Sequence, residues 1–167
     1  SGIGVGRAGQ PAGTNSPPAV FTTNAPPNLN SDNDKLFGRS FEELRKQAEN
    51  GDTAAMAELG GRYRNGVHGA TKDFAEAVKW YQKAALHGNA KAQYALGVCY
   101  QRGEGVLPDD KEGVAWYRKA AEQGYAVAQY ALGFCYYYGA GMPRDFGEAV
   151  AWYRKAAEQG CAIAQYA

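Results

Sequence analysis

The sequence predicts an all-α superhelical solenoid built from helix-pair repeats, and three observations lead to this prediction. Trp80, Trp116 and Trp152 stand 36 residues apart, and a tyrosine follows each of them. A glycine stands eight residues after each tryptophan. A Leu-Gly pair recurs at residues 96–97 and 132–133, with a copy at residues 59–60 that is one residue out of step. A fixed period between about 20 and 50 residues, combined with helical periodicity, is typical of a stacked repeat array.

The composition divides the chain near residue 38. Residues 1–38 contain five of the seven prolines, six of the 22 glycines and no Tyr or Trp. Such a stretch cannot bury enough apolar surface to offset its ordering entropy, so we expect a disordered tail. Residues 39–167 form the predicted repeat domain. Its expected parts are an N-terminal capping helix at 39–50, repeats at about 51–87, 88–123 and 124–159, and a partial fourth repeat at 160–167.

The second helix of each repeat carries the tryptophan, and both of its ends have a sequence signal. Asp73, Asp109 and Asp145 stand at the expected starts, and a glutamate follows each of them after three residues. This spacing predicts an N-cap with a capping-box glutamate, which satisfies backbone N–H groups that lack a partner within the helix. The glycine after each tryptophan ends the helix because glycine adopts the left-handed conformation without steric cost.

The first helix of each repeat is expected at residues 52–65, 89–102 and 125–138. In the middle copy the apolar stripe contains Leu96 and Cys99, which are three residues apart. Neighbouring Ala and Tyr side chains continue this stripe at helical spacing. Cys99 and Cys135 occupy equivalent positions, so we expect both to be buried thiols that pack as small apolar groups. The Trp-Tyr pairs are expected to pack between helices rather than to form an aromatic ligand site.

Charge and composition exclude several classes of function. The chain has 18 Lys and Arg against 17 Asp and Glu, which gives no electrostatic basis for binding nucleic acid. No apolar run reaches the roughly 18 residues of a transmembrane helix. Three cysteines without a C-x-x-C pair are too few for a disulfide scaffold. A G-x-G-x-x-G match at residues 4–9 lacks the flanking strand and helix of a dinucleotide site.

No catalytic residue, cofactor or metal site is predicted. His68 and His87 are the two histidines, and neither lies in a metal-binding motif. No motif pairs a cysteine with a histidine, and no G-x-S-x-G occurs. The regularly spaced acidic residues stand at helix starts, where capping accounts for them. We therefore expect a protein that is not an enzyme.

Two segments resemble the Sel-1-like repeat, a relative of the tetratricopeptide repeat. They are AQYALGVCYQRGEGV at residues 92–106 and AWYRKAAEQG at residues 115–124. The resemblance covers residues 51–167, and the paired cysteines of the cysteine-rich Helicobacter subgroup are absent. It implies an α/α superhelix that serves as a scaffold or adaptor for protein partners, in secretion, envelope, signalling or host-contact settings, without enzymatic activity.

The resemblance also implies a binding surface, because the first helices of tetratricopeptide arrays line the concave face. Transferred to this chain, the inward residues are Ala54, Ala57, Gly61, Arg64 and Asn65, then Lys91, Tyr94, Val98, Gln101 and Arg102, then Val127, Tyr130, Phe134, Tyr137 and Tyr138. Tyr and Arg are enriched at binding hot spots. We predict that a protein or peptide partner binds this face through Tyr94, Gln101, Arg102, Tyr130, Phe134, Tyr137 and Tyr138. Whether Val98 and Phe134 belong to the core or to the groove stays open.

Two alternative functions use the same surface. The chain is a regulatory or immunity-type inhibitor of a partner protein, or an interaction module of a longer chain whose catalytic domain lies elsewhere. Residues 160–167 are too few for a stable helix, so we expect either a piece of a longer array or an end that a partner covers. Many bacterial members of the family that the chain resembles are exported, and residues 1–38 suit a tether after a removed signal. A periplasmic or secreted location is thus favoured over the cytoplasm, although the location stays open.

Overall fold

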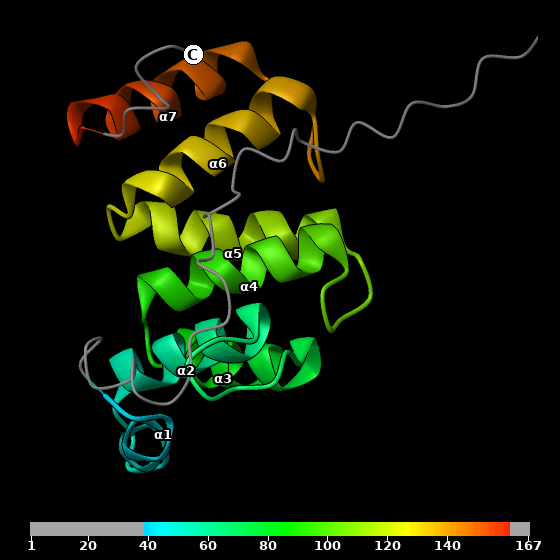
Figure 1. Cartoon of the computed structure of the whole chain (residues 1–167). Coiled ribbons are helices and arrows are strands. Elements are labelled where there is room, and N and C mark those ends of the chain that lie inside the picture. Colours follow the sequence, from blue (N-terminus) through cyan, green and yellow to red (C-terminus); the bar gives the residue numbers. More distant parts are fainter. Residues whose placement is uncertain (1–38, 161–167) are drawn as a thin grey trace, which may run out of the picture.

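The computed structural model describes residues 39–160, which form seven α-helices and, within that range, no strand (Figure 1). The helices are α1 (Phe41–Glu49), α2 (Thr53–Asn65), α3 (Phe74–Leu86), α4 (Ala90–Arg102), α5 (Asp110–Glu122), α6 (Ala126–Tyr138) and α7 (Phe146–Glu158). The predicted all-α fold is therefore confirmed. The expectations for the tail at 1–38 and for the partial fourth repeat beyond residue 160 lie outside the described residues.

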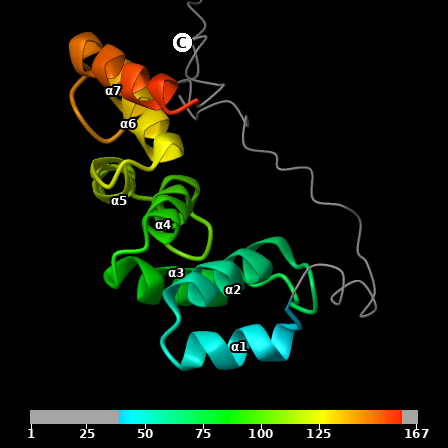
Figure 2. The ribbon, with the colours of Figure 1, turned by 90° about the vertical axis from the view of Figure 1, so that its left-hand side faces the viewer.

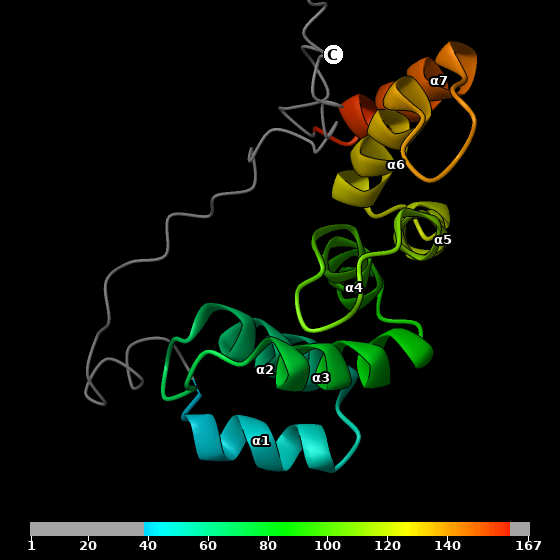
Figure 3. The ribbon, with the colours of Figure 1, turned by 90° about the vertical axis from the view of Figure 1, so that its right-hand side faces the viewer.

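The helices stack in chain order as pairs. α2 packs against α3, α4 against α5 and α6 against α7, while α3 packs on α4, α5 on α6, and α1 on α2. Two side views place α2, α4 and α6 on one side of the array and α3, α5 and α7 on the other (Figures 2 and 3). Successive pairs are rotated relative to one another, which coils the array into the predicted superhelix. We call the side formed by α2, α4 and α6 the first-helix face.

The second helices begin at the predicted aspartates, but their glutamates do not complete a capping box. The side chains of Asp73, Asp109 and Asp145 accept hydrogen bonds from the backbone N–H three residues later. The N–H of each aspartate donates instead to a tyrosine carbonyl of the preceding helix, at 2.8–3.0 Å. This half of the capping-box prediction was wrong, because a carbonyl of the preceding helix already accepts the N–H that the glutamate would bind. Glu148 accepts a hydrogen bond from Trp152 Nε1 at 3.2 Å instead.

The helices end where the sequence predicts, at glycines with positive φ. Gly103 ends α4 with a φ of 68°, and its N–H donates to the carbonyl of Cys99. Gly124 follows α5 with a φ of 83°. A side chain with a Cβ is disfavoured in this left-handed conformation, so the glycines set the lengths of the helices.

The Trp-Tyr pairs pack between helices as predicted. Tyr81 and Tyr117 are buried, and each ring lies against a glycine of the first helix in its own pair. Each tryptophan has a lysine of the next turn over its ring, with Nζ 4.0–4.3 Å from the ring centroid. The largest fully buried side chains are Leu44, Leu59, Leu96, Leu132, Cys99 and Cys135. Leucine and cysteine thus fill the repeated interior while small residues allow the helices to approach closely.

Buried glutamines connect one helix pair to the next. Gln93 Nε2 donates to the Ala85 carbonyl at 3.1 Å, and Gln93 Oε1 accepts from Gln123 Nε2 at 2.6 Å. Gln129 repeats both hydrogen bonds one pair later, at 3.2 Å and 2.7 Å. Ala85 and Ala121 stand in the last turns of α3 and α5, so each glutamine adds a side-chain hydrogen bond to a helix end and helps to fix the stacking of neighbouring pairs.

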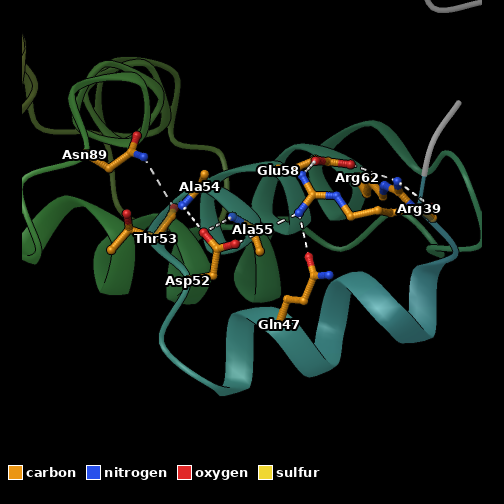
Figure 4. Close-up of polar contacts among 9 residues, drawn as sticks. All are labelled: Arg39, Gln47, Asp52, Thr53, Ala54, Ala55, Glu58, Arg62 and Asn89. Carbon is orange, nitrogen blue, oxygen red and sulfur yellow. Dashed lines mark hydrogen bonds and ion pairs between the residues drawn. The ribbon is translucent and has the colours of Figure 1, made fainter.

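A polar network attaches α1 to the first pair (Figure 4). Arg39 donates to Gln47 Oε1 at 2.6 Å and to Glu58 Oε2 at 2.9 Å. Arg62 is 5% exposed and donates to Glu58 Oε1 at 2.8 Å and to the Arg39 carbonyl at 2.9 Å. Because a buried charge is costly without a partner, Glu58 is what makes the burial of Arg62 tolerable.

Candidate functional site

A groove of about 700 Å³ opens on the first-helix face. Side chains of α2 and α4, the loop after α2, and the start of α6 line it. Eight of the inward residues that the sequence predicts are among its lining, namely Ala57, Gly61, Arg64, Asn65, Lys91, Tyr94, Val98 and Val127. We call this feature the first-helix groove.

Helical spacing places these side chains together. Ala57, Gly61 and Arg64 are four and then three residues apart on α2, so they lie along one face of that helix. Lys91 and Val98 lie along one face of α4 in the same way. Ala57 and Val98 are each 4% exposed and form the floor, so Val98 is both part of the core and part of the groove.

Arginines surround the α2 end of the groove, and carboxylates are shared between them. Glu104 lies 2.7 Å from Arg64 and 3.7 Å from Arg102. Burial opposes the charge on Arg64, but its hydrogen bond and ion pair with Glu104 outweigh burial and raise its pKa. Glu58 is shared in the same way between Arg39 and Arg62. Each of these carboxylates therefore bridges two guanidinium groups.

The three predicted binding residues of α4 have different surroundings. Tyr94 lines the groove, with its ring centroid 5.6 Å from that of Tyr117 and 5.7 Å from that of Tyr125. Gln101 lies outside the groove lining and accepts a hydrogen bond from the Tyr117 hydroxyl at 3.0 Å. Arg102 is also outside the lining, where it extends the arginine cluster. The groove therefore brings Tyr94, but not the other two, into its wall.

The predicted residues of α6 lie beyond the groove. Tyr130 contacts Tyr153 of α7, with the ring centroids 5.3 Å apart. Phe134 is half-buried, and its ring centroid is 4.3 Å from that of Tyr138. Tyr130 and Phe134 follow Val127 at spacings of three and four residues, so they continue along α6 the face that reaches the groove.

An exposed aromatic cluster forms the far end of this face. Tyr137 contacts Tyr138 at 4.9 Å and Phe146 of α7 at 5.3 Å, measured between ring centroids. Tyr137 is 44% exposed, Tyr138 41% and Phe146 54%. We call Phe134, Tyr137, Tyr138 and Phe146 the aromatic patch. The aromatic patch takes its residues from both α6 and α7. The sequence pattern of α6 alone could therefore not predict that Phe146 belongs to it.

Sequence reasoning missed some residues of these surfaces. The groove is also lined by Glu58, Arg62, Val67, His68, Tyr81, Ala95 and Tyr125. His68 has a φ of 51°, unusual for a residue other than glycine, and its carbonyl accepts from Arg62 Nη1 at 3.4 Å. The available signal for this departure was one extra residue between Gly66 and Asp73, which puts the first Leu-Gly pair one residue out of step. Phe146 was also missed; its equivalents in the first and second repeats are Phe74 and Asp110.

Neither an activated thiol nor a metal-binding cluster is present among the described residues. Burial raises the pKa of Cys99 and Cys135 to about 12, which keeps both thiols protonated and unreactive near neutral pH. Within residues 39–160, no group of three or more His, Cys, Asp and Glu side chains is placed to hold a metal ion. Nor does any helix in that range have the length and apolar composition needed to cross a bilayer.

The repeats match a known family model, the Sel1 repeat, at residues 53–89, 90–125 and 126–161. The chain belongs to the Sel1 repeat family. The boundaries fall at the starts of α2, α4 and α6, so each Sel1 repeat consists of a first helix, its loop and a second helix. The resemblance stated from the sequence is therefore confirmed. Sel1 repeats typically mediate protein–protein interaction.

Solved structures and a curated relative extend the comparison. A protective antigen of uropathogenic Escherichia coli with the SLR fold has a TM-score of 0.70 and 44% identity, over 73% of this Sel1 chain and 26% of that one. A Sel1 repeat protein from Oxalobacter formigenes has a TM-score of 0.70 and 35% identity, over 74% and 49%. The ERAD-associated E3 ubiquitin-protein ligase component HRD3A of Arabidopsis thaliana is 35% identical over 65 residues, which are 39% of this chain and 10% of that protein.

Proposed function

We propose that this Sel1 array is a non-enzymatic interaction module that binds a protein or peptide partner along its concave, first-helix face. The first-helix groove is the observation that carries the proposal. A concave site of about 700 Å³, lined mainly by apolar side chains with a few charged ones, has the size and character of sites that bury ligand side chains. Three consecutive repeats contribute to it, so an extended segment can contact all of them.

The aromatic patch supports the same proposal, because the fold does not require it. Tyr137 and Tyr138 correspond to Gln101 and Arg102 of the preceding repeat. Stacking of the helix pairs is thus compatible with polar side chains at these positions. Exposed aromatic side chains that cluster without a structural need are typical of interaction surfaces, where tyrosine supplies large contact area with few rotors to freeze.

The relatives support the binding role. The Arabidopsis relative is named as an ERAD-associated E3 ubiquitin-protein ligase component. For the present chain we propose only the general role of binding a protein. Tyr94, Gln101, Arg102, Tyr130, Phe134, Tyr137 and Tyr138 are the residues that we propose to contact the partner.

Partner capture with matched variants tests this function. Partners are crosslinked and captured from the native organism with the wild-type array, and the affinity of a captured partner is then measured by titration. The double variant Tyr137→Ala and Tyr138→Ala is expected to weaken binding by about 2 kcal/mol or more, as hot-spot residues do. The control is Leu86→Ala with Leu107→Ala, since these side chains are 77% and 87% exposed and lie outside both surfaces. Unchanged binding by a tyrosine double variant that melts like wild type would contradict the assignment.

A further inference from the structure

The surroundings of the first-helix groove carry an excess of positive charge that the array as a whole does not. Residues 39–160 contain 16 Lys and Arg against 15 Asp and Glu, which is nearly neutral. Three cations and one carboxylate line the groove, which is an excess of two positive charges. Adding the residues joined to them by ion pairs gives five cations and three carboxylates, and the excess stays at two. The cations are Arg39, Arg62, Arg64, Arg102 and Lys91, and the carboxylates are Asp52, Glu58 and Glu104.

Lys91 is the cation that this arrangement leaves without a partner. The four arginines each lie within 4.0 Å of a carboxylate, whereas Lys91 forms no ion pair in the described part of the chain. Lys91 is the second residue of α4, it is exposed, and it lines the groove. Its ammonium group is therefore available to a ligand, and the nearby arginines add to the positive potential around it.

The apolar groove wall begins directly beside Lys91. Tyr94, Ala95 and Val98 follow it at spacings of three, four and seven residues, so they share its face of α4. Val98 is buried at the floor, and Tyr94 presents a half-buried ring. A ligand held by its charge at Lys91 would thus place its neighbouring side chain against an apolar surface.

Resting on the proposed function, we infer that the first-helix groove binds an acidic segment of a protein partner. A carboxylate of an Asp or Glu side chain pairs with Lys91, and an adjacent apolar side chain packs against Tyr94 and Val98. A basic segment would bring like charges together at Lys91 and is disfavoured.

Two charge-reversed variants at matched positions test the inference. Lys91→Glu and Lys111→Glu each change the second residue of a helix, α4 and α5 respectively, and Lys111 lies outside the groove. Both substitutions place an acidic residue in a first turn, where the helix dipole favours it, so both variants should fold. Lys91→Gln removes the charge without reversing it and serves as a milder second variant.

The probe is a random peptide library displayed on phage and panned against the intact chain. We expect the selected peptides to be rich in Asp and Glu next to apolar residues. Measured as synthetic peptides by fluorescence anisotropy, they should bind Lys91→Glu roughly tenfold or more weakly than wild type, with Lys91→Gln between the two. Lys111→Glu should bind within about twofold of wild type, and added salt should weaken binding. Peptides with Asn and Gln in place of Asp and Glu should lose the affinity, whereas amidation of the C-terminus should not.

The possible results separate this inference from the proposed function. Neutral or basic peptides that bind wild type and lose affinity on Tyr94→Ala would overturn the acidic preference and leave groove binding intact. Equal weakening by Lys91→Glu and Lys111→Glu would overturn the pairing with Lys91, because only the overall charge would then matter. Loss of affinity on amidation would assign the carboxylate to a chain end instead of a side chain. A selection without any peptide sensitive to groove variants would contradict both proposals.

Discussion

Gly97 of α4 and Tyr117 of α5 are in such close contact that a Cβ on Gly97 would lie 2.7 Å from two ring carbons of Tyr117. The same Cβ would lie 2.9 Å from the carbonyl of Gly113. Tyr117 is 3% exposed, and its hydroxyl donates to Gln101 at 3.0 Å, so the ring cannot move aside freely. The Leu-Gly pair of the repeat therefore records a helix–helix contact, which recurs between Gly133 and Tyr153.

The substitution Gly97→Ala should destabilise the array. Alanine normally favours a helix over glycine, but here the added methyl overpacks the contact with Tyr117, and we expect a net loss of about 1–3 kcal/mol. Urea unfolding followed by circular dichroism measures the difference. Gly61→Ala is the control, because its Cβ would find only the Tyr81 hydroxyl at 3.7 Å, an ordinary contact. Gly61→Ala should be as stable as wild type or slightly more stable. Equal urea midpoints for Gly97→Ala and Gly61→Ala would refute the role of the Gly97–Tyr117 contact in stability.

The substitution Gly105→Ala should weaken the junction between the first two repeats. A Cβ on Gly105 would lie 2.5 Å from the carbonyl carbon of Phe74 and 2.9 Å from the N atom of Ala75, at the start of α3. Gly124→Ala is the control, because Gly124 has a similar φ, +83° against +75°, but nothing within 4 Å of its Cβ. Both variants bear the backbone strain of roughly 1 kcal/mol, and only Gly105→Ala adds the clash. Thermal unfolding should therefore show a clearly larger loss of stability for Gly105→Ala than for Gly124→Ala. Equal losses would contradict the role of Gly105 in the junction between the repeats.

Stability should fall as the pH is raised above 9, in part because Cys99 and Cys135 are buried. Burial raises the pKa of each thiol from 9.0 to about 12 in the folded chain. The stability that the protonated thiols contribute is thus fully present below pH 9 and is lost as the pH rises towards 12. Each thiol adds a slope of up to about 1.4 kcal/mol per pH unit in that window.

Urea unfolding across that pH range measures this slope in a Cys161→Ser background. The control combines Cys99→Ala with Cys135→Ala, which lowers stability overall but removes the thiol part of the slope; tyrosine ionisation then remains common to both proteins. If the free energy of unfolding falls with pH by the same amount in both proteins, the thiols do not contribute to the slope. Iodoacetamide labelling near neutral pH gives an independent check, since the native protein should label at these cysteines only when it unfolds.

Much of the fold could be predicted because its signals are local. The aspartate at the start of a second helix and the glycine at its end act within one turn of chain, and Asp73 and Gly124 stand where the sequence places them. The glutamate half of the capping box failed for a non-local reason. The N–H of Asp73 already donates to the carbonyl of Tyr63, ten residues away on the preceding helix.

The candidate site was less predictable, because helical spacing assigns a face and not a partner. The transferred repeat pattern predicted Lys91 and Tyr94 as inward residues, and both line the groove, while their contact with a partner stays a prediction. It grouped Gln101 with them, although the Tyr117 hydroxyl binds Gln101 from another helix. It also missed Phe146, which reaches Tyr137 only because α6 and α7 pack together.

The sequence by itself determined the helices, their pairing and the 36-residue repeat, since each depends on residues that are close along the chain. Only the tertiary structure decided how charges and rings from different repeats meet. Arg64 and Glu104 are 40 residues apart and join across two repeats, while Lys91 is left without a carboxylate. The physical reason is that side-chain pairing depends on the rotation between successive helix pairs, and no local pattern encodes that rotation.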